Sequence, residues 1–289
     1  MNIAVSGASG FIGTYLIKKF SSMGWNVLTV SRDVLLNPER FEDLMQIISQ
    51  SSVVISLNGA SMLRRLTPKN KILLRESRIQ AVGQLTNAMK QVDKKPRLFV
   101  SVSAVGIYEP GQLHSEYDIK YNDDFIGQLC REWEAEAMKA NDLNIRTVVF
   151  RLGVVLGKQG GVIKKLFPLF KAGLGAIILP SSSSFPWVHI SDLAYAFVFA
   201  AENENMHGVF NLAANEQTNQ KHFAMAFAKA LRRPLWLVMP PFVLRIIYGK
   251  GVDIITKNPF VQSVRLKEAG FNFEFSDIDE AMSDLLKKN

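Results

Sequence analysis

The chain has 289 residues, which is enough for one large domain or for two closely packed lobes with a full hydrophobic core. Apolar residues make up 48% and charged residues 21% of the sequence, as in an ordinary globular protein. The single cysteine, Cys130, excludes an intramolecular disulfide framework and fits a reducing compartment. These figures exclude a small disulfide scaffold and a disordered chain.

Neither a membrane nor a nucleic acid is an expected partner. The N-terminus runs directly into a strand-like stretch without a basic region followed by an apolar one, and no apolar run reaches the ~20 residues that span a bilayer. The net charge is +8, but the basic residues are scattered pairs such as Arg64/Arg65 and Arg232/Arg233, without a stripe or a zinc-ligand spacing. We therefore expect a cytoplasmic protein without a metal site, whose surface favours small anionic ligands.

Short apolar runs alternate with helical patterns over the first half of the chain. Because strands separated by helices of this length form parallel sheets covered on both faces, the pattern predicts a doubly wound α/β fold. The expected strands are Ile3–Val5, Val27–Val30, Val53–Leu57, Arg97–Ser101 and Thr147–Arg151, and the expected helices are Ile12–Ser22, Pro68–Gln91 and Asp123–Ala140.

The pattern changes after residue 155, where glycines, prolines and the run Ser181–Ser184 interrupt it. We expect a sheet domain over 1–155 and a smaller, mainly helical substrate lobe over 156–289, which includes a helical module at 240–289. Val209–Leu212 is a candidate strand that returns to the main sheet. The apolar stretch LWLVMPPFVLRIIYG at 235–249 predicts a core helix, and a subunit contact in a homodimer is its alternative.

The strongest motif is SGASGFIG at 6–13, in which Gly7, Gly10 and Gly13 follow the first strand and open the first helix. Gly7 allows a tight turn, Gly10 lets the backbone approach a pyrophosphate, and Gly13 lets helix and strand pack closely. The free N–H groups of the helix then face the phosphates. The motif predicts a dinucleotide site that also includes Ser9, Phe11 and Ile12.

The end of the second strand reads TVSRD, which places Ser31 and Arg32 where an acidic residue would bind the ribose of NAD. An arginine there suits a 2′-phosphate, because a charge-assisted hydrogen bond contributes about 1.5–3 kcal/mol. We therefore expect NADP, while Asp33 leaves NAD open as the alternative.

Several further segments resemble the extended short-chain dehydrogenase/reductase family, in its NAD-dependent epimerase/dehydratase group. The resemblance is closest to the atypical YfcH-like or SulA-type branch, which carries a C-terminal DUF1731-like module. It implies a Rossmann domain followed by a substrate lobe. The segments are TPKNKILLRESRI at 67–79, SVSAVGIY at 101–108, DDFIGQLCREWEAEA at 123–137, RLGVVLGKQGG at 151–161, FPWVHISDLA at 185–194 and LKEAGFNFEF at 266–275.

The resemblance also implies further cofactor contacts. The loop Leu57, Asn58, Gly59 and Ala60 is similar to the one that passes the adenosine and pyrophosphate in the family. By the same resemblance, Arg78 lies on the helix that lines the groove, and Leu152 lies where relatives hold the nicotinamide.

One family feature is missing. Ordinary members transfer a hydride with a serine and a Tyr-x-x-x-Lys pair, whose lysine lowers the tyrosine pKa from about 10. Here the only such spacing, Tyr15–Lys19, falls on the first helix beside the phosphates. The expected helix carries Phe125, Ile126, Leu129, Cys130 and Trp133 instead. Cys130 is expected to be a small buried hydrophobic residue.

Polar side chains remain in the loop after the fourth strand, at the edge of the sheet where ligands bind. Ser103 best matches the family serine and would hydrogen-bond a substrate oxygen. Tyr108 is the candidate proton donor, although no lysine is visibly placed to lower its pKa, and an aromatic packed over the cofactor is the alternative. The resemblance further assigns Arg151, Trp187 and His189 to the substrate cleft, with structural roles for His189 and Asp192 as the favoured alternative.

Two functions of different classes follow from these residues. The first is an NADP-dependent oxidoreductase or epimerase that acts on a small hydroxyl- or carbonyl-bearing substrate, of which nucleotide sugars are one class. The second is a regulatory or redox-sensing protein that binds NADPH without turnover. The missing Tyr-x-x-x-Lys supports the second function, and the polar loop at 101–108 supports the first.

Overall fold

A computed structural model of the protein describes residues 1–287. Its centre is a parallel sheet of six strands in the order β10-β6-β4-β3-β1-β2. This confirms the predicted doubly wound α/β fold. The strands are β1 (Asn2–Ser6), β2 (Asn26–Val30), β3 (Val53–Ser56), β4 (Leu98–Ala104), β6 (Arg146–Leu152) and β10 (Gly208–Leu212).

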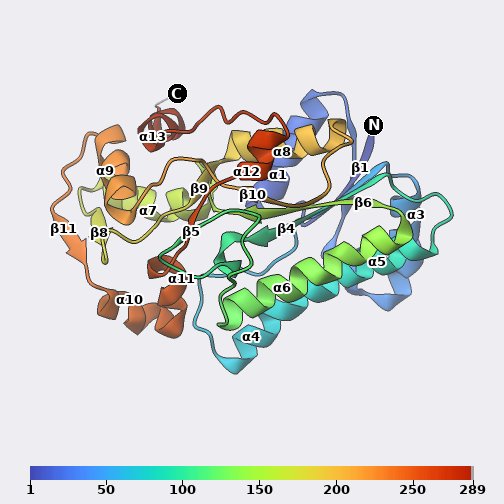
Figure 1. The fold of residues 1–289 in the computed structure, drawn as a ribbon, viewed down its shortest axis with the longest axis horizontal. Coiled ribbons are helices and arrows are strands. Elements are labelled where there is room, and N and C mark those ends of the chain that lie inside the picture. The colour runs from blue at the N-terminus through green and yellow to red at the C-terminus, as the bar shows by residue number, and fades with distance from the viewer. Residues whose placement is uncertain (288–289) are drawn as a thin grey trace.

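Helices cover both faces of this sheet (Figure 1), so the inner strands β1, β3, β4 and β6 are almost entirely buried, whereas the edge strand β2 is partly exposed. One face carries α1 (Phe11–Ser22) and α8 (Ile190–Glu202), which pack against each other. The other face carries α3 (Phe41–Ser49), α5 (Ala81–Gln91) and α6 (Phe125–Met138). A short helix, α2 (Arg32–Leu36), follows β2.

The helix expected over 68–91 is one continuous helical run with a change of pitch inside it. It begins as α4 (Pro68–Arg75), widens to a π-helical turn at Glu76–Gln80, and continues as α5. Thr67 caps its start by accepting a hydrogen bond from the Asn70 N–H. A π-helical turn inside an α-helix often marks a functional site, and this one borders the groove described below.

The segment after residue 155 contributes to both parts of the molecule. Its α8 and β10 belong to the main sheet, where β10 pairs in parallel with β6, as expected for Val209–Leu212. A second hydrophobic core lies under α7 (Gly161–Lys171), α9 (Gln220–Ala230) and α13 (Ile278–Leu286). The chain therefore crosses between the two cores more than once.

Short strands and helices complete this second part. Three two-stranded sheets join β7 to β9, β8 to β11 and β5 to β12. Their bounds are β5 (Leu113–His114), β7 (Val154–Gly157), β8 (Ala176–Ile178), β9 (Trp187–His189), β11 (Leu237–Met239) and β12 (Phe260–Val261). The remaining helices are α10 (Pro241–Tyr248), α11 (Asp253–Thr256) and α12 (Val264–Glu268). Among the described residues, no helix is long and apolar enough to cross a membrane.

Candidate functional site

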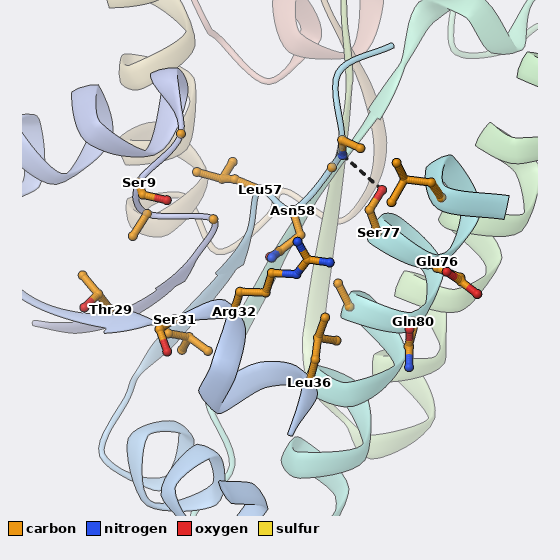
Figure 2. A pocket seen from close by; sticks show the side chains of 18 of the residues that line it. Ser9, Thr29, Ser31, Arg32, Leu36, Leu57, Asn58, Glu76, Ser77 and Gln80 are labelled. Atoms are coloured by element: carbon orange, nitrogen blue, oxygen red, sulfur yellow. Dashed lines mark hydrogen bonds between the residues drawn. The ribbon is translucent and has the colours of Figure 1, made fainter. Parts of the chain in front are cut away.

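A groove of about 690 Å³ opens beside the carboxyl ends of β1 and β3 (Figure 2). The chain leaves β1 toward β2 on one side and continues through β3 on the other, so this is the topological switch point of the sheet, where such folds bind ligands. The lining residues are Gly7, Ala8, Ser9, Gly10, Ile17, Thr29, Val30, Ser31, Arg32, Leu36, Leu57, Asn58, Gly59, Ala60, Leu73, Glu76, Ser77, Gln80 and Ala81.

The glycine turn forms one end of the groove. Gly7 has a φ of +80°, and a Cβ there would lie 2.8 Å from the backbone carbon of Leu57. A Cβ on Gly13 would lie 2.4 Å from the Gly7 carbonyl oxygen, so only glycine lets α1 approach β1 this closely. No side chain caps the start of α1, which leaves its first N–H groups open to an anion.

The two side chains that follow β2 distinguish a site for a ribose 2′-phosphate from a site for free ribose hydroxyls. Arg32 extends into the groove toward Asn58 (Figure 2). Asp33 instead forms an ion pair with Arg40 at 2.8 Å, and this hydrogen bond lowers the pKa of the Asp33 carboxyl. Asp33 is absent from the groove lining, so of these two neighbours only the cation, Arg32, faces the groove.

The loop after β3 is held in place from both sides. Asn58 accepts a hydrogen bond from the Ser6 hydroxyl. The Ala60 N–H donates to Ser77 Oγ at 3.0 Å (Figure 2), and Arg78 Nη2 donates to the Ala60 carbonyl at 2.8 Å. Both partners come from the π-helical turn, which therefore fixes the far wall of the groove.

Arg78 supports this loop from beneath. Its guanidinium is buried, lies 5.1 Å from the centre of the Trp133 ring, and would be 3.0 Å from a Cβ on Gly59. Burial lowers the pKa of Arg78 to about 10. Arg78 thus acts through Ala60 and is not itself part of the lining.

Nine of the predicted cofactor residues line the groove, namely Gly7, Ser9, Gly10, Ser31, Arg32, Leu57, Asn58, Gly59 and Ala60. The other five lie outside it: Phe11, Ile12, Gly13, Arg78 and Leu152. The Phe11 ring turns toward Gly157 and Gly160, where a Cβ would meet it at 2.5 and 2.3 Å. Leu152 packs instead against the main core.

Sequence reasoning missed the wall contributed by the long helix. Leu73, Ser77, Gln80 and Ala81 all line the groove. Their spacing of about one and two helical turns was a detectable signal, because residues at that spacing share one helix face. Because this face mixes small, polar and apolar side chains, it shows no apolar periodicity.

Three serines lie buried at the carboxyl ends of β3 and β4. The Oγ atoms of Ser56, Ser101 and Ser103 have no hydrogen-bond partner among the described residues. Ser103 lies beside the thiol of Cys130, and burial raises the pKa of that thiol to about 12. Cys130 is buried and uncharged, as the sequence predicted.

Tyr108 is fully buried in a polar network. Its hydroxyl donates to Asn211 Oδ1 at 2.9 Å and accepts from Arg151 Nη1 at 2.7 Å. Arg151 in turn makes two hydrogen bonds to the Glu134 carboxylate, at 2.8 and 2.7 Å. Burial raises the pKa of Tyr108 to about 12 despite the nearby guanidinium. This geometry holds the tyrosine neutral and occupied, which favours a structural role over the expected proton donor.

The three residues expected in the substrate cleft are also buried. Arg151 is committed to Glu134 and Tyr108, and the Trp187 Nε1–H donates to Thr218 Oγ1 at 2.8 Å. His189 caps α8 by accepting from the Ser191 N–H, and its ring packs on Phe275 at 4.1 Å. The structure therefore places all three in structural contacts. No group of three or more metal-binding side chains is found among residues 1–287.

Comparison with known proteins assigns the chain to a protein family. The model of the NAD dependent epimerase/dehydratase family matches residues 3–213, and the model of DUF1731, a domain of unknown function, matches residues 239–285. The chain belongs to the NAD dependent epimerase/dehydratase family. This confirms the resemblance seen in the sequence, including the C-terminal module.

The family relatives match over almost the whole chain. The mouse epimerase family protein SDR39U1 is 32% identical over 99% of this chain and 100% of its own length. The epimerase family protein YfhF of Bacillus subtilis is 29% identical, over 99% and 98%. The crystal structure of human SDR39U1 with NADPH superposes with a TM-score of 0.90 at 29% identity, over 99% of both chains.

Proposed function

We propose that this epimerase-family protein binds NADP(H) in the groove and acts as an atypical oxidoreductase or epimerase. The observation that carries the cofactor choice is the opposite placement of two neighbouring side chains. Arg32 faces the groove, whereas Asp33 is held outside it by Arg40. A guanidinium suits the 2′-phosphate that distinguishes NADP from NAD. The NADPH in the crystal structure of the human relative supports the same choice.

The chain's own residues would bind and orient the cofactor in a definite manner. The glycine turn and the open N–H groups of α1 suit the pyrophosphate, and the loop at 57–60, which lines the groove, would hold the adenosine half. When bound, NADP(H) supplies or accepts the hydride. Its substrate would be a small molecule with a hydroxyl or carbonyl group, with nucleotide sugars as one candidate class.

Ser103 is the residue that we propose for contact with the substrate oxygen. Its hydroxyl lies at the carboxyl end of β4 beside the weakly bonding Cys130 thiol and has no other hydrogen-bond partner among the described residues, which is costly for a buried polar group unless a ligand completes it. The Tyr108 hydroxyl already donates to Asn211 and accepts from Arg151. The proton that the reaction transfers would therefore have to come from water or from the substrate itself.

The cofactor proposal is tested by titrating NADPH and NADH into the wild type and the Arg32→Ala variant. We expect Arg32→Ala to weaken NADPH by about tenfold or more and to change NADH by less than about twofold. Lys90→Ala removes an exposed cation from the end of α5 and is the matched control. Equal losses for both nucleotides would show that Arg32 does not read the 2′-phosphate.

A regulatory or redox-sensing role is the second candidate, and a specific observation favours it. The titratable side chains near Ser103 are unsuited to proton transfer near neutral pH, since burial raises the pKa values of Tyr108 and Cys130 to about 12. An assay that follows NADPH absorbance with a panel of aldehydes, ketones and nucleotide sugars distinguishes the two functions. Tight binding without oxidation of NADPH or conversion of any sugar would favour the regulatory role.

A further inference from the structure

An exposed apolar surface lies at one end of the molecule, where β11 and α10 are found (Figure 1). Trp236, Phe242 and Ile246 are 75%, 67% and 68% exposed, which is unusual for side chains of this size. The complete set, called the apolar end here, is Leu174, Trp236, Leu237, Val238, Phe242 and Ile246.

These residues come from two segments that the fold brings together. A Cβ on Gly173 would lie 4.0 Å from Pro234, and β8, which follows Leu174, pairs with β11. The chain then passes from β11 directly into α10, on which Phe242 and Ile246 are four residues apart and share a face. The sequence had predicted a core helix here, but the structure leaves this helix face exposed.

The two segments that form the apolar end are basic, although Lys229 and Arg232 share a pocket with the carboxylates of Glu274, Asp279, Glu280 and Asp284. Residues 161–178 and 229–250 contain eight lysine and arginine side chains and no aspartate or glutamate, which equals the net charge of +8 of the whole chain. Lys229 pairs with Asp279, and Arg245 lies 3.8 Å from Asp253. Lys171, Arg233 and Lys250 form no ion pair among the described residues.

We propose that this end of the protein docks on an anionic membrane surface without crossing the membrane. Bulky apolar side chains set among cations are the combination that inserts into the headgroup region of a bilayer, with tryptophan at the boundary and the cations on acidic lipids. A second copy of the chain is a poor occupant, because two such ends would bring their positive charges together. The proposal differs from the expectation, drawn from sequence, that no membrane partner exists.

The chain carries its own reporter for this contact. Of its four tryptophans, Trp133 and Trp187 are buried and Trp25 is half-buried, so Trp236 is the most exposed of the four. Its emission should move to shorter wavelength when the indole leaves water. The full-length protein is mixed with vesicles of phosphatidylcholine alone or of phosphatidylcholine with phosphatidylglycerol, and bound protein is measured by sedimentation.

We expect binding and a shift in emission only with the anionic vesicles, and release when the salt concentration is raised. The double variant Phe242→Ser, Ile246→Ser should lower vesicle affinity about tenfold or more, and Lys171→Glu or Arg233→Glu roughly fivefold each. Ile119→Ser removes an apolar side chain that is even more exposed but lies elsewhere, and should change nothing.

Three results would overturn the proposal. The first is no binding to anionic vesicles, and the second is binding that is equal on neutral ones. The third is a dimer in sedimentation velocity that the Phe242→Ser, Ile246→Ser variant abolishes, which would assign the surface to a second copy of the chain. Because all of these side chains are exposed, the variants should fold, and circular dichroism checks that they do.

Discussion

The hydroxyl of Tyr108 accepts a hydrogen bond from Arg151 Nη1 at 2.7 Å while donating its own proton to Asn211. Asn211 belongs to β10 and uses its Nδ2 to donate to the Gln262 carbonyl in the C-terminal module. The tyrosine therefore connects the loop after β4 with two neighbouring strands of the sheet and, through Asn211, with the module that follows them.

Replacing Tyr108 with phenylalanine should reduce stability without affecting the cofactor. The change leaves a buried guanidinium N–H and a buried amide oxygen without partners, so we expect the free energy of unfolding to fall by about 1–3 kcal/mol. NADPH affinity and any turnover should stay close to wild type. Urea denaturation and nucleotide titration measure the two effects, with Tyr121→Phe as control, because the Tyr121 ring neighbours Tyr108 at 6.3 Å.

The opposite outcome would restore the catalytic role expected from the sequence. If Tyr108 donates the proton, Tyr108→Phe would abolish turnover in addition to lowering the free energy of unfolding. The two roles are therefore distinguished by whether turnover survives the substitution.

Breaking the buried ion pair of Arg151 and Glu134 should lower the free energy of unfolding more than Tyr108→Phe does. Glu134→Gln removes the charge that compensates a buried guanidinium, so the free energy of unfolding should fall by about 3–5 kcal/mol. The double variant Arg151→Met, Glu134→Leu removes both charges and should regain much of that loss. Urea denaturation of the three proteins measures this. A double variant that is no more stable than the single one would show that the pair is not coupled in this way.

The sequence revealed the cofactor half of the site because its chemistry depends on local spacing. The three glycines and the Arg32 position each lie within a few residues of a strand end, where the pattern of the chain determines the turn. The Tyr108, Glu134, Arg151 and Asn211 network could not be found this way. Its members are 17 to 103 residues apart and meet only through the packing of α6 and β10 on β4 and β6.

The second half of the chain was harder to predict from sequence, because its contacts also join residues that are far apart in the chain. Its short strands pair with distant partners, such as β5 with β12 and β8 with β11, and such pairings leave no periodic signal. The apolar residues of α10 indicated a core helix, since apolar content alone does not tell a buried face from an exposed one. Only the three-dimensional structure shows which way that face points.

Replacing Ser103 should lower turnover without lowering the free energy of unfolding. Among the described residues its buried hydroxyl has no hydrogen-bond partner stronger than the Cys130 thiol, so Ser103→Ala should leave the free energy of unfolding within about 0.5 kcal/mol of wild type. If Ser103 contacts the substrate oxygen, the same variant should lose turnover by about a hundredfold with NADPH affinity unchanged. Ser101→Ala is the matched control, because Ser101 is on the same strand and is also buried without a hydrogen-bond partner among residues 1–287. Similar activity losses in both variants would contradict the specific role.

A final prediction concerns two buried groups at the start of α8. Burial lowers the pKa of His189 to about 4, against a weaker opposing effect of Asp284, and burial raises the pKa of Asp192 to about 6. The unfolded chain binds the extra proton at His189 between pH 4 and 6.5, so that residue makes stability rise with pH. At Asp192 the folded protein binds the extra proton between about pH 4 and 6, which makes stability fall as pH rises.

The two contributions are each about 3 kcal/mol and opposite in sign, so they should largely cancel in the wild type between pH 4 and 6. Asp192→Asn should leave only the contribution of His189, so that stability rises with pH relative to wild type. His189→Asn keeps a good helix cap and should leave only the contribution of Asp192, so that stability falls as pH rises. Urea denaturation across this range measures the slopes, and the double variant should again run parallel to wild type. Single variants whose slopes match the wild type would show that neither group titrates differently in the folded protein.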